Sequence, residues 1–190
     1  VNPSLYARLP YDPIKDFAPI TNMVNYPLLL VTHPSVPVKN VRELVALAKA
    51  KPDQLSYASP GSGNSGHLAG ELFNSMAGVQ TVHIPYKGQG PALTDLLSGQ
   101  VSMLYSSIPS VIQQVKSGQL RALAVGSAKR LPSLPDIPTL AESGVPGYEA
   151  YSWVGLVEPA HTPADIVKKI HRDVRSEERR VGTECRSRWS

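Results

Sequence analysis

Ser59-Pro60-Gly61-Ser62-Gly63-Asn64-Ser65-Gly66-His67 is the stretch that decides the fold, because it joins two runs of different periodicity. The apolar run before it, residues 55–58, is typical of a buried strand, and the run after it, residues 68–76, has the spacing of a helix. A glycine-rich turn in this position is suited to hold an anion. The first N–H groups of a helix have no partner within it, and the helix dipole places about half a positive charge there. The stretch therefore predicts a site for a carboxylate or a phosphate.

Length and composition describe a globular chain. It has 190 residues, of which 42% are hydrophobic and 18% are charged, and this balance excludes an intrinsically disordered protein. No apolar run approaches the roughly 20 residues that a membrane-spanning helix needs. The sequence begins at Val1 without a methionine, so we expect a fragment or a processed chain.

The net charge of +4 is concentrated at one end of the sequence. Residues 172–190 contain six of the ten arginines and the single cysteine, Cys185, and the rest of the chain is close to neutral. This distribution removes the support for nucleic-acid binding that a basic isoelectric point would give. The absence of other cysteines excludes a disulfide scaffold, and the five histidines lack metal-ligand spacing, so we expect no metal site.

Apolar runs that indicate strands alternate with helical patterns along the chain. The predicted strands are 27–31, 55–58, 81–84, 101–105, 120–125 and 153–157. This alternation implies βαβ units and a mostly parallel sheet, which binds ligands at the carboxyl ends of its strands. Asn40 and Glu43 resemble a capping box at the start of one helix. For the helix after the glycine-rich turn, the predicted buried face is Leu68, Leu72, Phe73 and Met76.

Two enzymatic interpretations of the turn compete with simple binding. Gly61, Gly63 and Gly66 have the spacing of a dinucleotide fingerprint, which also needs an acid at the end of the next strand. No Asp or Glu lies between Glu71 and Asp95, so a dinucleotide-dependent enzyme is kept only as the alternative function. A hydrolase is disfavoured, because the second glycine of a nucleophile elbow is replaced by histidine.

Other polar residues follow strands at the same predicted edge of the sheet. Tyr86 either lies over a ligand or belongs to an ordinary β–α turn, and Ser106 offers a hydroxyl. His67 either contacts the ligand or bonds to the backbone at its helix start. Carboxylates are absent from these loops, which favours an acidic ligand. The predicted ligand-binding residues are Ser59, Gly61, Ser62, Gly63, Asn64, Ser65, Gly66, His67, Tyr86 and Ser106, and none is predicted to be catalytic.

Several segments share their pattern with one known family. They include LPYDP (9–13), DFAPI (16–20), LSYAS (55–59), HLAGELF (67–73), PYKG (85–88), LRALAV (120–125) and GVPGYE (144–149). They resemble the Bug-type solute receptors, the substrate-binding components of tripartite tricarboxylate transporters, and the resemblance extends to about Val174. It implies an α/β, two-lobed type II periplasmic-binding-protein fold, with mostly parallel sheets, flanking helices and one lobe incomplete.

The resemblance also implies a division of the chain. Residues 1–23 would be part of lobe one, residues 24–129 would form lobe two with the ligand turn, and residues 130–175 would connect back to lobe one. Residues 176–190 break the pattern and are interpreted as a foreign tail. The leader, the opening half of lobe one and the closing helices of the family would lie outside this sequence.

The implied function is that of a periplasmic, non-enzymatic receptor without a cofactor. It would bind a di- or tricarboxylate, an amino acid or an aromatic acid and deliver it to membrane transporter subunits. We expect a monomer when complete, with no nucleic-acid partner and no insertion into the membrane. Many relatives carry an acid where this chain has Ser106, so a plain carboxylate is favoured over an amino acid. A ligand-sensing module of a regulator is a third interpretation, which would need a helix-turn-helix upstream.

Overall fold

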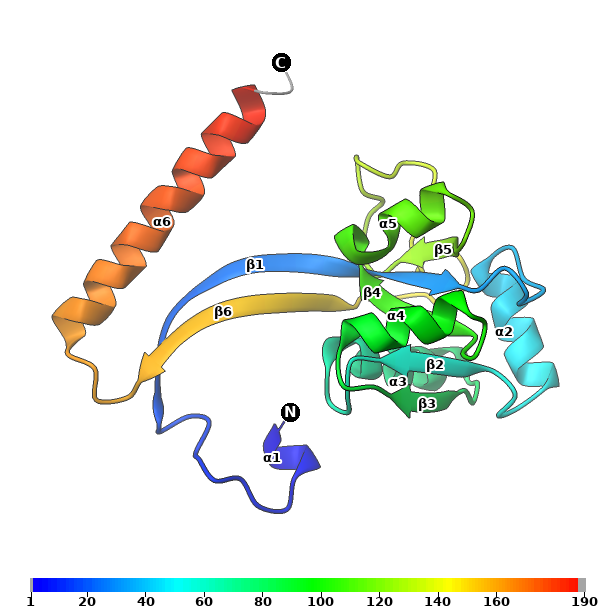
Figure 1. The fold of residues 1–190 in the computed structure, drawn as a ribbon, viewed down its shortest axis with the longest axis horizontal. Helices are drawn as coiled ribbons and strands as arrows, with labels where there is room; N and C mark the ends of the chain where they lie inside the picture. Colours follow the sequence, from blue (N-terminus) through cyan, green and yellow to red (C-terminus); the bar gives the residue numbers. More distant parts are fainter. Residues whose placement is uncertain (1, 188–190) are drawn as a thin grey trace. The chain divides into compact units, whose positions relative to one another are not determined.

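The computed structural model describes residues 2–187, with side chains as far as Glu177, and it contains two compact units (Figure 1). Unit one combines the residues up to Asn25 with those from Trp153 onward, and unit two is Tyr26–Ser152. Residues 130–152 thus group with unit two, and their assignment to a lobe of a complete receptor stays a prediction. Val1 and residues 188–190, the end of the predicted foreign tail, lie outside the described residues.

Unit two is built on a sheet with the strand order β3-β2-β4-β1-β5. The strands are β1 (Phe17–Thr32), β2 (Ser56–Ser59), β3 (Val82–Pro85), β4 (Met103–Ser107) and β5 (Arg121–Val125). β2 is parallel to β3 and β4, whereas β1 is antiparallel to β4 and β5. The sheet is therefore mixed rather than mostly parallel, because β1 comes from the start of the chain and runs against both of these neighbours.

Helices cover both faces of this sheet. They are α2 (Val41–Ala50), α3 (Ser65–Ala77), α4 (Gln89–Leu97) and α5 (Ile108–Lys116). Alternate residues of β1 belong to two apolar clusters, which identifies the two faces: Leu28 and Leu30 pack with α2 and α3, and Leu29 and Val31 pack with α4 and α5. Burial on both faces explains the unbroken apolar run in this strand.

The helix start predicted at Asn40 is confirmed, although the Glu43 carboxylate accepts from the Lys39 N–H at 2.6 Å rather than from the Asn40 N–H. The Asn40 Oδ1 atom accepts a hydrogen bond from the Glu43 N–H at 2.9 Å, and its Nδ2 atom donates to the Glu43 carboxylate at 2.8 Å. These contacts satisfy a helix-terminal N–H that has no partner inside the helix.

The predicted buried face of α3 is largely wrong. Leu68, Leu72 and Met76 are 40%, 37% and 39% exposed, and only Phe73 is buried as expected. The residues of α3 that are buried are Gly66, Ala69, Gly70 and Phe73. The helix lies so close to the sheet that a Cβ atom on Gly70 would stand 2.3 Å from the ring of Tyr57. Apart from Phe73, the buried residues of α3 are therefore small, and Leu68, Leu72 and Met76 are partly exposed.

Unit one contains α1 (Asn2–Leu5), α6 (Ala164–Ser187) and most of β6 (Tyr151–Pro159). The part of β6 that belongs to this unit begins at Trp153. β6 pairs with β1, and the His171 Nδ1 atom of α6 lies 2.9 Å from the Ile20 carbonyl oxygen. Across residues 2–187, none of the helices combines the length and the apolar character needed to span a bilayer.

Candidate functional site

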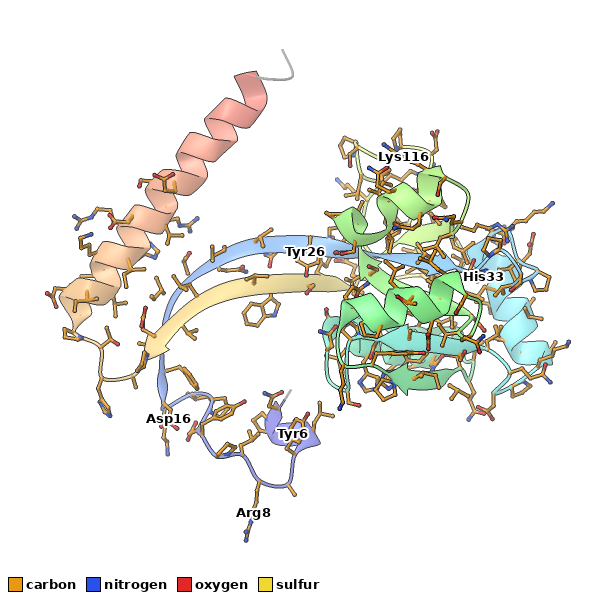
Figure 2. All side chains as sticks on the ribbon, viewed as in Figure 1. Tyr6, Arg8, Asp16, Tyr26, His33 and Lys116 are labelled. Atoms are coloured by element: carbon orange, nitrogen blue, oxygen red, sulfur yellow. The ribbon has the colours of Figure 1, made fainter. Side chains whose placement is uncertain are left out.

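A pocket of about 280 Å³ lies in unit two. It is lined by Tyr26, Leu28, Pro60, Asn64, Ser65, Gln89, Tyr105, Ser106, Ser107, Ser110 and Ser152. Tyr26, labelled on β1 in Figure 2, belongs to this lining. None of the lining side chains carries a charge, and most of the polar ones are hydroxyls and amides. Such a lining offers neutral hydrogen-bond donors.

Three helices begin at this pocket. Asn64 and Ser65 start α3, Gln89 is the first residue of α4, and Ser107 and Ser110 lie at the start of α5. Each helix terminus contributes about half a positive charge from its aligned peptide dipoles. The pocket therefore combines positive potential with neutral donors, which suits an anion and disfavours a cation. Its place beyond the carboxyl ends of β2 and β4 is where α/β sheets bind ligands.

The side chain of Asn64 caps α3 next to the pocket. Its Oδ1 atom accepts a hydrogen bond from the Gly66 N–H at 3.0 Å. The hydroxyl of Ser65 lies 3.1 Å from the hydroxyl of Ser152, a residue 87 positions later in the sequence. Gly63, in the preceding turn, has a φ of +81°, a left-handed conformation that favours glycine.

The predicted site residues divide into those at the pocket and those that support it. Asn64, Ser65 and Ser106 line the pocket, whereas Ser62 is exposed and is not part of the lining. Ser59 is fully buried; its Oγ atom accepts from the Gly61 N–H at 3.2 Å. Its role in the structure is thus to hold the turn.

Tyr86 is engaged within the fold and is not part of the pocket lining. Its hydroxyl donates to the Asp95 carboxylate on α4 at 2.7 Å. Burial, together with this hydrogen bond and the charge of Asp95, raises the pKa of Tyr86 to about 12. Tyr86 was expected either to lie over a ligand or to belong to an ordinary β–α turn, and this contact is of the second kind.

His67 and His83 stack behind the glycine-rich turn. Their ring centroids lie 3.9 Å apart at an interplanar angle of 19°. The His67 Nδ1 atom accepts from the Gly63 N–H at 3.0 Å, and the His83 Nε2 atom lies 2.6 Å from the Ser59 hydroxyl. Burial lowers the pKa of His83, the charge of His67 lowers it further, and Glu71 acts in the opposite direction. His67 therefore bonds to nearby backbone, as one of its two interpretations stated.

Sequence reasoning missed several lining residues. Gln89 donates from Nε2 to the Ser106 hydroxyl at 2.8 Å. Its position in the loop after a predicted strand was the feature of the sequence that could have identified it. Ser110 lies inside the first turn of its helix, beyond the loop that follows the strand. Tyr26 and Ser152 are distant from the turn in sequence and carry no local signal. Among the side chains of residues 2–177, no cluster of three His, Cys, Asp or Glu is placed to hold a metal ion.

Residues 1–181 match the family model described as "Tripartite tricarboxylate transporter family receptor". Among solved structures, the chain is similar to Rpa4515 of R. palustris with adipate, with 40% identity and a TM-score of 0.85 over 89% of this chain and 56% of that one. It is also similar to the periplasmic binding protein BugD, with 38% identity and a TM-score of 0.83 over 90% of this chain and 57% of that one. A third is MatC of Rhodopseudomonas palustris with bound malate, with 31% identity and a TM-score of 0.83 over 93% and 60% of the two chains.

The chain spans about half the length of the curated relatives it matches. Two of them are 37% and 36% identical over 170 and 171 residues, and the match covers 51% and 52% of their lengths. The solved neighbours include a periplasmic binding protein, and the mixed sheet with flanking helices is the fold that they share with this chain.

Proposed function

The chain belongs to the tripartite tricarboxylate transporter receptor family, and on that premise we propose that it is part of a periplasmic receptor for a small carboxylate. The receptor binds its ligand without transforming it and delivers it to membrane subunits of the transporter. The ligand carboxylate rests at the start of α3, close to the side chains of Asn64 and Ser65, and the neutral groups of Gln89 and Ser106 complete this side of the site.

The observation that carries the proposal is the meeting of three helix starts at one uncharged pocket. Each helix terminus contributes about 0.3–2 kcal/mol toward an anion, and each hydrogen bond to a charged group about 1.5–3 kcal/mol. Several such contacts approach the roughly 8 kcal/mol of a micromolar complex. The family resemblance implies a second lobe in the complete receptor, so we expect the 190-residue chain alone to bind weakly.

The proposed ligand class is a dicarboxylate. Two solved neighbours hold adipate and malate, and the lining of the pocket here carries no acid that would pair with an ammonium group. Ser106 is 1% exposed, and its hydroxyl accepts from the Gln89 amide and donates to the Ser107 carbonyl oxygen, so this position places a neutral group, and no carboxylate, at the pocket. An α-amino group would be desolvated there without a counter-ion, which is unfavourable.

Calorimetric titration of the complete receptor tests the proposal. Adipate and succinate should bind, monomethyl adipate should bind more weakly, and aspartate should bind more weakly than succinate, its deaminated analogue. Recovery of unchanged ligand after incubation should show that binding involves no reaction. Tighter binding of aspartate would refute the neutral-pocket argument. Binding of NADH in place of every carboxylate would favour the dinucleotide-dependent enzyme instead.

A further inference from the structure

The hydrogen bond between Gly63 and His67 fixes the protonation state of one imidazole nitrogen. The Gly63 N–H points at the His67 Nδ1 atom at 3.0 Å. A nitrogen that accepts a hydrogen bond has no proton of its own, so neutral His67 carries its proton on Nε2. Protonation of Nδ1 would place two donors opposite each other across this distance. The Gly63–His67 contact therefore exists only while His67 is neutral.

Few groups that carry or could gain charge face the two stacked rings. Glu71 lies on the same helix as His67, with its Oε1 atom 3.9 Å from the His67 Nε2 atom. Tyr57 of β2 stacks against both rings, at centroid distances of 6.5 Å from His67 and 5.0 Å from His83. The Tyr57 hydroxyl donates to Glu71, which occupies one oxygen of that carboxylate. Among the side chains of residues 2–177, each histidine is the other's remaining titratable neighbour in these contacts.

These neighbours make the stack sensitive to a proton. Two positive imidazoles at a centroid distance of 3.9 Å repel each other, so uptake of a first proton opposes uptake of a second. Burial opposes the charge on His83, and His83 is tied to Ser59 at the base of the turn. The two rings thus hold the turn at both ends, Ser59 before Gly61 and Gly63 before the start of α3.

We propose that His67 and His83 form a pH-sensitive latch on the glycine-rich turn, closed when His67 is neutral and released when His67 is protonated. Histidine is the side chain that gains a positive charge most readily in mildly acidic solution, so acid is the signal that would release the latch. Release removes one of the contacts that hold the segment before Asn64, and leaves the bond from the Asn64 N–H to the Gly61 carbonyl oxygen at 3.2 Å in place. Release of the latch should weaken carboxylate binding at acid pH, and this consequence rests on the proposed function. The latch itself does not depend on that function.

The test follows the Gly63 amide and the His67 ring nitrogens by NMR in the ligand-free chain. At pH 8 the His67 ring should be the Nε2–H tautomer, and the Gly63 amide signal should be shifted downfield by its hydrogen bond. As the pH falls to 5, the Gly63 signal should move upfield with the same midpoint as the His67 ring. A Gly63 signal that does not titrate would overturn the proposal.

Two substitutions of His67 separate the latch from general effects of acid. His67→Asn keeps an acceptor at the position of Nδ1 but cannot titrate, so the Gly63 amide should stay downfield from pH 8 to 5. His67→Ala removes the acceptor and should give the upfield signal at every pH. His161→Asn, at an exposed position of unit one, is the matched control. In this variant the Gly63 amide signal should shift with pH as it does in the unaltered chain. If His67→Ala does not fold, His67→Asn still decides, because a Gly63 signal that titrates in this variant contradicts the latch.

Calorimetry on the complete receptor gives a separate readout with adipate as the probe. Affinity should fall at least threefold between pH 7.5 and 5.5, and the fall should be smaller in the His67→Asn variant. Failure to bind adipate at any pH would refute the proposed function and leave the NMR result intact. Equal pH dependence in both proteins would refute the link between latch and ligand.

Discussion

Gly66 of α3 lies against Tyr105 of β4 so closely that a Cβ atom on Gly66 would stand 2.9 Å from the Tyr105 carbonyl oxygen. Backbone atoms cannot yield as a flexible side chain can. Gly66→Ala should therefore push the start of α3 away from the sheet and lower the free energy of unfolding by about 1–3 kcal/mol, the usual cost of overpacking. Urea denaturation measures this loss. The same variant should weaken dicarboxylate binding, because Asn64 and Ser65 move with the helix.

Gly90 provides the matched control for this prediction. It is the second residue of α4, as Gly66 is of α3, but beyond its chain neighbours and the backbone of its own helix no atom lies within 4 Å of the point that an alanine methyl group would occupy there. Gly90→Ala should change stability by less than Gly66→Ala does, because the helix preference of alanine offsets the restriction that Pro91 places on the residue before it. Equal destabilisation by both substitutions would contradict the steric argument at Gly66.

Substitutions of Asn64 should separate capping from ligand binding. Asn64→Ala removes the acceptor for the Gly66 N–H and should cost about 1 kcal/mol of stability. Asn64→Asp keeps an acceptor and adds a negative charge that suits a helix start, so stability should be retained. The same charge should repel a carboxylate and reduce affinity at least tenfold in the complete receptor. Asn64→Ser introduces a capping residue without charge and should lose less affinity than Asn64→Asp. A larger loss of affinity in Asn64→Ser than in Asn64→Asp would place the ligand elsewhere.

Much of unit two could be predicted because its signals are local. Each predicted strand overlaps an observed one, since apolar runs bounded by turn residues are read within a few positions. The direction of β1 could not be predicted in this way, because it depends on where the chain enters the sheet. The length of β1, from Phe17 to Thr32, was also missed, since its first half is largely exposed and lacks an apolar pattern.

The candidate site was predictable to the extent that it is built from the turn itself. Asn64 and Ser65 were found from the sequence because they are polar residues in a glycine-rich turn that leads into a predicted helix. Ser152 joins the pocket only through the tertiary fold, at a hydrogen-bond distance from Ser65. The buried face of α3 was misjudged because hydrophobicity was weighed without the close approach to the sheet that Gly66 and Gly70 allow.

Tyr86→Phe tests whether the tyrosine after β3 serves the fold or the ligand. The substitution removes the hydroxyl that donates to Asp95 at 2.7 Å and keeps the ring. We expect a loss of about 0.5–1.5 kcal/mol in the free energy of unfolding, the net value of one hydrogen bond. Dicarboxylate affinity should change less than twofold, since Tyr86 does not line the pocket. A loss of affinity without a loss of stability would restore the predicted contact with the ligand.

His83 should make the stability of the fold depend on pH in the acid range. Burial lowers the pKa of His83 in the folded state, with a further contribution from His67. An unfolded histidine titrates near about pH 6.5, so below this value the unfolded chain binds more protons at this position than the folded chain does. The free energy of unfolding should therefore fall as the pH drops through about 6.5 toward the lowered pKa. His83→Gln keeps a polar contact for Ser59 without a titrating group and should make this fall shallower. Urea denaturation at pH 7.5 and 5.5 measures both slopes, and identical slopes would show that His83 binds its proton equally well in the folded and unfolded chains.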